Sequence, residues 1–286
     1  MRVMAYAYPM EDTRMTRKPY PTDLTDPEWD YIAPFVGQKA GRGRRRTVNI
    51  REIINAILYM NKTGCQWQMI PHDFPEPGHI SYYYYMWQDD GTLDEILVTL
   101  RRDVRVSEGR EREPSAAILD SQSVKIAGNG DDVGFDGNKR IKGRKRHIAV
   151  DILGLLLLVW VTPANMPDCD GGAQLCDELQ HTAPRVKKVW ADSAYSGNLV
   201  EYVTHWCRFV LEIVKKLPKQ QGFQVQPKRW IVERTFAWLN QQRRLSKEYE
   251  RTTKSSESMI KIAAIRLMLR RLTVNAVRMV AATPIF

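Results

Sequence analysis

The stretch Arg229-Trp230-Ile231-Val232-Glu233-Arg234-Thr235-Phe236-Ala237-Trp238-Leu239 has the pattern of a helix with one buried face. Val232, Phe236 and Leu239 recur at the i, i+4, i+7 spacing of an apolar stripe. Glu233 falls at the edge of that stripe, where a half-buried carboxylate is costly unless a cation meets it. Arg229, one turn earlier, is one candidate cation. The alternative is a site that Glu233 shares with other carboxylates and a bound ion.

Composition favours an anionic partner and argues against a structural zinc site or a membrane protein. The chain has 286 residues with Lys+Arg 43 against Asp+Glu 33, a formal net charge of +10. Its four cysteines form no Cys-x-x-Cys pair, and its five histidines show no metal-finger spacing. The most apolar run, residues 153–161, is far shorter than a membrane span. We therefore expect a soluble, cytoplasmic protein without a membrane partner.

The first third of the chain has the periodicity of short helices. Residues 1–20 are expected to be a loose tail, residues 21–106 a small helical domain that binds DNA, and residues 107–114 a charged linker. Within the helical domain, a Gly-rich loop without periodicity carries four arginines: Arg42, Arg44, Arg45 and Arg46. Such a loop is either a solvated linker or an arm that contacts phosphates, and we favour the arm.

The remaining chain alternates strands and helices. Strands are predicted over residues 116–124, 147–151, 155–161, 188–192 and 209–214, and helices over residues 170–181, 197–206, 229–239 and 255–278. This order predicts an α/β domain with a mixed sheet at residues 115–247 and a C-terminal helical extension at residues 248–286. It also fits a ribonuclease-H-like arrangement.

Two further carboxylates stand at the ends of apolar runs. Asp120 closes the run of the first strand, and Asp192 closes the fourth strand. Each could form a turn or cap a helix, and the Ser-Ala-Tyr-Ser-Gly that follows Asp192 makes this reading reasonable there. Together with Glu233, however, they would repel one another unless divalent cations lay between them, and an oxygen-only ligand set selects Mg²⁺ or Mn²⁺. Two such ions, with Asp120 contacting both, would serve an in-line phosphoryl transfer.

Several blocks of the sequence, in the same order, resemble the DDE transposases of bacterial insertion sequences, in the insertion-sequence-five family. The N-terminal blocks are Ala56-Ile57-Leu58-Tyr59, Thr63-Gly64-Cys65-Gln66-Trp67, Ile70-Pro71 and Asp73-Phe74-Pro75. The catalytic blocks are Ile118-Leu119-Asp120-Ser121-Gln122-Ser123-Val124-Lys125, Lys142-Gly143-Arg144-Lys145-Arg146-His147, Ala191-Asp192-Ser193-Ala194-Tyr195 and residues 229–239. The resemblance covers nearly the whole chain.

The resemblance implies that Asp120, Asp192 and Glu233 are the metal-binding triad. It further implies binding to the inverted repeats that end the protein's own element, cleavage there, strand transfer into a target, and action as a dimer or larger synaptic complex. The sequence departs from the broader signature at two positions, with Gln226 in place of Tyr and Asn240 in place of Lys. We hypothesise that Arg243 or Arg244 supplies the missing phosphate contact.

A basic run precedes the second strand, and we expect it to contact the phosphates of double-stranded DNA. The run comprises Lys139, Arg140, Lys142, Arg144, Lys145 and Arg146. Lys125, Arg229 and Arg234, within the blocks that carry the acids, are further predicted contacts. Two alternatives stay open: a DNA-binding protein without catalysis, and a nuclease of the same fold that hydrolyses but does not join strands.

Overall fold

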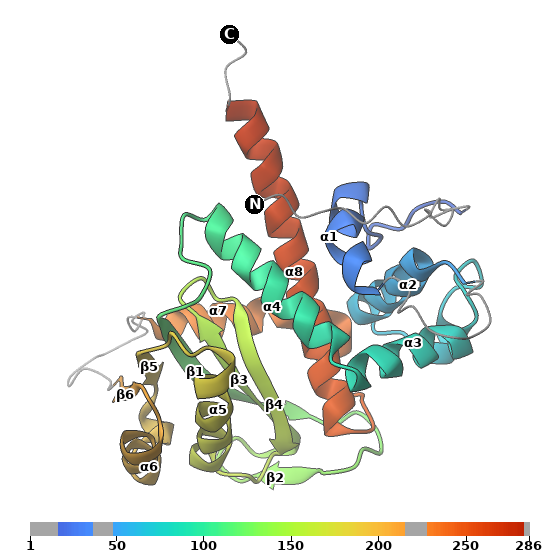
Figure 1. Cartoon of the computed structure of the whole chain (residues 1–286). Coiled ribbons are helices and arrows are strands. Elements are labelled where there is room, and N and C mark those ends of the chain that lie inside the picture. Colours follow the sequence, from blue (N-terminus) through green and yellow to red (C-terminus); the bar gives the residue numbers. More distant parts are fainter. Residues whose placement is uncertain (1–16, 37–47, 215–227, 283–286) are drawn as a thin grey trace, which may run out of the picture.

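The computed structural model describes residues 17–36, 48–214 and 228–282. Its N-terminal part is helical (Figure 1). The helices are α1 (Asp26–Val36), α2 (Ile50–Thr63), α3 (Pro77–Asp89) and α4 (Thr92–Ser107), with a short 3-10 turn, η1 (Trp67–Met69), between α2 and α3.

The ends of these helices follow from local sequence signals. Thr25 and Glu28 form a reciprocal cap at the start of α1, in which the Thr25 N–H donates to Glu28 (2.9 Å) and the Glu28 N–H donates to Thr25 Oγ1 (3.4 Å). Asn49 caps α2, and Gly64 ends it with a positive φ of 77°, a conformation that favours glycine. The residue types at these positions therefore account for where α1 begins and where α2 begins and ends.

A six-stranded mixed sheet forms the second part of the molecule. Its strands are β1 (Ala116–Lys125), β2 (Gly134–Asp136), β3 (Ile141–Asp151), β4 (Leu156–Pro163), β5 (Lys188–Ala191) and β6 (Val210–Ile213). The order is β2-β3-β1-β5-β6, and β4 also pairs with β3. β3 runs antiparallel to β1 and β4, whereas β5 runs parallel to β1 and β6. The predicted α/β, ribonuclease-H-like sheet is confirmed.

Helices cover both faces of this sheet. On one face, α5 (Asp168–Thr182) and α6 (Asn198–Trp206) pack over β1 residues Ala117 and Leu119. On the other face, α7 (Arg229–Asn240) and α8 (Thr253–Ala282) pack over Ile118. Because side chains alternate along a strand, Asp120 shares the face of Ile118 and α7, and Ser121 shares the face of Leu119 and α5.

The N-terminal helices share one hydrophobic core with the sheet. This core includes Ile53 of α2, Leu100 of α4, Ile148 of β3 and Ala263 of α8. Figure 1 shows α8 passing beside α4 on its way from the sheet to the N-terminal helices. The division into a helical domain, a catalytic domain and a C-terminal extension stays a prediction, and α8 contacts both α4 and β4.

Two predicted boundaries are also corrected. β3 begins at Ile141, six residues before the predicted start, and β2 lies within a predicted loop. Residues 142–146 are mostly Lys and Arg, and this low hydropathy is typical of a loop. The start of the strand was therefore not predicted. At the N-terminus, the predicted tail includes Arg17, whose side chain is 2.8 Å from both Asp23 and Glu52. In the described ranges, no helix is long and apolar enough to cross a membrane.

Candidate active site

Asp120 lies in the middle of β1, so the prediction that it ends a core strand is corrected. The parallel pairing of β1 with β5 nevertheless stops two residues earlier, at Ile118 and Trp190. Beyond that point β1 continues along β3 alone, and Asp120 faces Ile148 there. Asp120 thus emerges where the parallel strands separate, at the carboxyl edge where open α/β sheets bind their ligands.

Asp192 directly follows β5 at the same edge. Its Oδ1 accepts the N–H of Ala194 (2.9 Å) and so caps the 3-10 turn η2 (Ser193–Tyr195). Its Oδ2 lies 3.7 Å from Arg229 Nη2. The alternative reading of Asp192 as a turn former is therefore correct for one oxygen, while the other oxygen faces α7.

α7 brings Glu233 to the two aspartates. The predicted apolar stripe is confirmed, since Val232, Phe236 and Leu239 are buried. Glu233 lies beside this stripe with about half of its side chain exposed, and its Oε1 is 3.3 Å from Arg229 Nη2. One guanidinium nitrogen of Arg229 thus pairs with both Asp192 and Glu233.

The electrostatics place Asp120 in the same group. Burial, with a smaller contribution from the negative charge of Asp192, raises the pKa of Asp120 to about 6. The Ser121 N–H, at 2.8 Å from Asp120 Oδ1, opposes this shift, as do the positive charges of Arg229 and Lys139. Arg229 therefore pairs with Asp192 and Glu233, and its positive charge also lowers the pKa of Asp120.

The donor set suits a hard divalent cation, because it contains only carboxylate oxygens. Across the described ranges, however, no three His, Cys, Asp or Glu side chains are close enough together to hold a metal ion. Arg229 pairs with two of the three acids here. The three side chains are of the kind that binds Mg²⁺ or Mn²⁺. To bind such an ion, Glu233 would have to give up its contact with Arg229.

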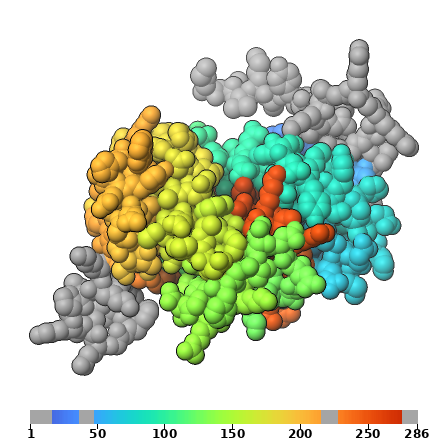
Figure 2. Space-filling model, turned by 90° about the horizontal axis from the view of Figure 1, so that it is seen from below, coloured from blue at the N-terminus to red at the C-terminus, as the bar shows by residue number. Residues whose placement is uncertain are grey.

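Four of the predicted basic contacts, on β1, on β3 and just before β3, are exposed: Lys125, Lys139, Arg140 and Lys142. Lys139 is near enough to Asp120 to lower its pKa. Figure 2 shows the green segment that contains β2 on the face seen from below, beside the yellow segment of α5. These side chains are free to meet a polyanion.

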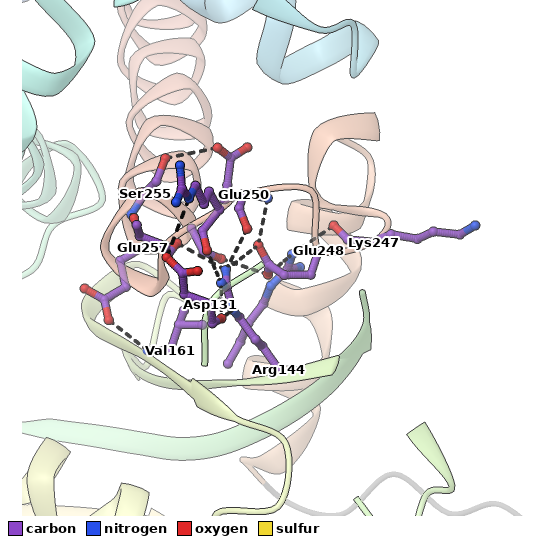
Figure 3. A network of polar contacts seen from close by, with 12 residues as sticks. Asp131, Arg144, Val161, Lys247, Glu248, Glu250, Ser255 and Glu257 are labelled. Carbon is purple, nitrogen blue, oxygen red and sulfur yellow. Dashed lines mark hydrogen bonds and ion pairs between the residues drawn. The ribbon is translucent and has the colours of Figure 1, made fainter. Parts of the chain in front are cut away.

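Arg144, Lys145 and Arg146 are buried within β3, which corrects their prediction as phosphate contacts. Arg144 donates to the carbonyls of Glu250 (2.9 Å) and Thr252 (3.1 Å), and Arg146 donates to Leu245 O (2.8 Å) and lies 3.1 Å from Glu248. Figure 3 shows this network, in which the arginines fasten the segment before α8 to the sheet.

Arg244 is also buried, with its Nε 2.6 Å from Glu250 and its Nη1 2.9 Å from Cys65 O. This burial corrects the prediction that Arg244 contacts a phosphate. Arg243 is exposed, but α7 ends at Asn240, and Arg243 belongs to the separate turn η3 (Arg243–Leu245). The hypothesis of a replacement for the signature lysine thus rests on Arg243 alone. Arg42, Arg44, Arg45, Arg46 and Gln226 lie outside the described residues.

Arg234 is stacked between the two tryptophans of α7. Its guanidinium carbon is 4.5 Å from the Trp230 ring centroid and 4.4 Å from that of Trp238, and it donates to Leu153 O (3.2 Å). This corrects the prediction that Arg234 contacts DNA, because its guanidinium is already in contact with both tryptophan rings and the carbonyl of Leu153.

No pattern in the sequence connects the start of α5 with the acids. In the structure, Asp168 Oδ1 is 2.6 Å from Ser121 Oγ and 3.1 Å from Lys145 Nζ. Cys169 Sγ is 3.2 Å from Ala194 O. The only signal is that Asp168 is an acid near the start of a predicted helix, and acids are common at that position.

Comparisons with known proteins define the class. The family described as "Transposase DDE domain" matches residues 111–269, which include Asp120, Asp192 and Glu233. The chain therefore belongs to the DDE transposases. Within that class, the family described as "Putative transposase of IS4/5 family" matches residues 24–97, in the N-terminal helices. The predicted resemblance to an insertion-sequence transposase is confirmed.

Two curated relatives match parts of the chain. One, "Uncharacterized protein y4sN" of Sinorhizobium fredii (strain NBRC 101917 / NGR234), is 35% identical over 82 residues, which are 28% of this chain and 64% of that protein. The other, "Putative transposase for insertion sequence element IS402" of Burkholderia cepacia, is 29% identical over 127 residues, 42% of this chain and 60% of that protein. In both cases the match spans less than two thirds of the relative.

Proposed function

We propose that this transposase binds the terminal inverted repeats of its own insertion sequence, cleaves the DNA at the element ends and joins the 3′ ends to target DNA. The observation that carries this proposal is the meeting of Asp120 from β1, Asp192 after β5 and Glu233 from α7 around Arg229. Three acids from distant parts of the chain converge at the edge of the sheet where α/β folds place their chemistry.

Asp120, Asp192 and Glu233 would hold two Mg²⁺ or Mn²⁺ ions, which supply Lewis-acid stabilisation of the attacking and leaving oxygens in phosphoryl transfer. Asp120 suits this role because its burial makes the unneutralised carboxylate costly, as its raised pKa indicates. The N–H groups of Ser121 and Ala194 orient the carboxylates of Asp120 and Asp192. The apolar stripe of α7 fixes the helix that carries Glu233.

Arg229 has two roles in this proposal. In the state described here it neutralises Asp192 and Glu233. When DNA and metal are bound, it would turn to a phosphate oxygen, since a guanidinium binds phosphate with good geometry. The same arginine would thus hold Asp192 and Glu233 near each other in the metal-free protein and contact the substrate in the DNA complex.

DNA would lie across the exposed basic residues beside the site. These are Lys125, Lys139, Arg140 and Lys142, with Arg243 further away on η3. Such contacts set affinity and register without reading sequence, which we assign to the N-terminal helices and the loop containing Arg42–Arg46. We expect a homodimer or larger synaptic complex acting in the cytoplasm at the nucleoid, because two element ends must be joined to one target.

The test is a cleavage and joining assay with Mg²⁺ on DNA that spans the element end and its flank, with a second DNA as target. The proposal predicts both activities for the wild type, and loss of both in Glu233→Gln with retained binding to the end. Glu201→Gln, on the exposed side of α6, is the matched control and should be active. Cleavage without joining would indicate a nuclease, and binding without either activity a DNA-binding protein.

A further inference from the structure

The first turn of α5 contacts the residues that follow both aspartates. On one side, Asp168 Oδ1 accepts a hydrogen bond from Ser121 Oγ (2.6 Å), and the N–H of Ser121 donates to Asp120 Oδ1 (2.8 Å). On the other side, Cys169 Sγ donates to Ala194 O (3.2 Å), and the N–H of Ala194 donates to Asp192 Oδ1 (2.9 Å). Two adjacent residues of one helix thus reach both aspartates through one intervening residue each.

The position of this turn is itself tightly fixed. Lys145, buried in β3, lies 3.1 Å from Asp168 and donates to the carbonyl of Met166 (2.7 Å), immediately before the helix. Asp168 is therefore paired with a cation that has little access to solvent. Such a pair holds its partners in one geometry, because losing either member leaves a buried charge.

Two glycines bring the helix this close. A Cβ at Gly171 would lie 2.2 Å from Cε1 of His147, and a Cβ at Gly172 would lie 2.7 Å from Cδ1 of Tyr195. Both distances are too short for any other residue without movement. The helix therefore rests directly on β3 and on the turn after Asp192. Burial raises the pKa of Tyr195 well above its usual range, and the charges of Asp120 and Asp168 add to this, so this ring lies among the acids.

We propose that the first turn of α5 is a positioning element for the catalytic centre, in which Asp168 and Cys169 fix the separation of Asp120 and Asp192. This inference rests on the metal site proposed above. Neither residue is a ligand; each acts through the segment after a ligand. Hydrogen bonds made directly to metal ligands commonly change metal affinity by about 10- to 100-fold, and contacts one residue removed are expected at the lower end of that range.

The test measures Mn²⁺ affinity of the full-length, DNA-free protein by electron paramagnetic resonance. Asp168→Ala and Cys169→Ala should each weaken Mn²⁺ binding by about tenfold. Asp168→Asn keeps an acceptor for Ser121 but leaves buried Lys145 without its anion, so its Mn²⁺ affinity should lie between those of Asp168→Ala and the wild type. Cys169→Ser keeps a donor for Ala194 and should stay within about twofold of the wild type. Asp170→Ala, on the exposed side of the same turn, is the matched control and should be unchanged.

A second readout is the Mg²⁺ concentration that gives half-maximal cleavage. It should rise about tenfold in the alanine variants, while the rate at saturating Mg²⁺ changes little. If Asp168→Ala does not fold, Ser121→Ala removes the same hydrogen bond with a smaller change and should show the same loss. A merely structural role would lower the melting temperature and leave the metal affinity of the folded protein unchanged.

Asp120→Asn separates the two proposals. If it abolishes Mn²⁺ binding while Asp168→Ala, Cys169→Ala and Ser121→Ala bind Mn²⁺ as the wild type does, the positioning role is wrong and the metal site stands. If Asp120→Asn leaves Mn²⁺ binding intact, the metal site itself is wrong, and the positioning role fails with it.

Discussion

The guanidinium of Arg229 lies 3.3 Å from the carboxylate of Glu233, one helical turn further along α7. The same nitrogen is 3.7 Å from Asp192, so a side chain of the protein supplies positive charge where the proposed ions would supply it. Metal binding must then displace an existing ion pair. This relationship makes the metal affinity of the DNA-free protein depend on Arg229.

Arg229→Gln should increase the affinity of the DNA-free protein for Mn²⁺ by about threefold or more, because two partly exposed ion pairs no longer compete. The same variant should bind DNA more weakly, since it loses a phosphate contact. Mn²⁺ titration followed by electron paramagnetic resonance measures the first effect and fluorescence anisotropy the second. Weaker Mn²⁺ binding in the variant would show that Arg229 supports the site rather than competing with the metal.

Asp120→Asn should stabilise the metal-free protein at neutral pH. The pKa of Asp120 is about 6 in the folded state against an ordinary 3.8, so the folded state binds this proton more tightly. The contribution of Asp120 to the free energy of unfolding should therefore fall as pH rises from about 4 to about 6 and stay lower above that, by about 2–3 kcal/mol.

Chemical denaturation in EDTA at pH 4 and pH 8 measures this effect. The asparagine variant should exceed the wild type at pH 8, and the two should converge near pH 4. The variant and the wild type share their other titrating groups, so the difference isolates Asp120. An equal difference at both pH values would contradict the burial of this carboxylate.

Two basic residues of β3 should behave in opposite ways. Arg144→Met should destabilise the protein by about 3–5 kcal/mol, because it leaves Glu248 and several carbonyls buried with fewer donors. Lys142→Met, two residues earlier and exposed, should leave stability unchanged within about 0.5 kcal/mol. Thermal and urea unfolding compare the two variants. Similar stabilities would contradict the network of Figure 3.

The salt dependence of DNA binding should identify the exposed basic residues. Replacing Lys139 and Arg140 by alanine should make the plot of log K against log salt less steep by about 1.8, if each neutralises one phosphate. Fluorescence anisotropy over a salt series measures the slope. An unchanged slope would place the DNA elsewhere on the molecule.

How much of this site could be predicted depended on the kind of signal. The apolar stripe of α7 and the abrupt polarity at Asp120 and Asp192 were visible because burial imposes a period on the sequence. The burial of Arg144 and Arg146 could not be predicted, because their partners are Glu248 and carbonyls about a hundred residues away. A charged run looks the same whether it faces solvent or a buried acid.

The packing of the helices was equally hidden. The pattern predicted α8 as a helix, but its contacts with α4 and β4 depend on tertiary arrangement, which periodicity does not specify. The link between Asp168 and Ser121 spans 47 residues and depends on how close α5 approaches β3. Gly171 and Gly172 permit that approach, but in the sequence they only weaken a helix.

Asp120, Asp192 and Glu233 should form one metal site. Anomalous scattering from crystals of the protein grown with Mn²⁺ and an element-end DNA shows where manganese binds. Manganese peaks should lie in contact with carboxylate oxygens of all three residues, with Arg229 turned away from Glu233. Manganese bound elsewhere, or a site that leaves Glu233 paired with Arg229, would contradict this prediction.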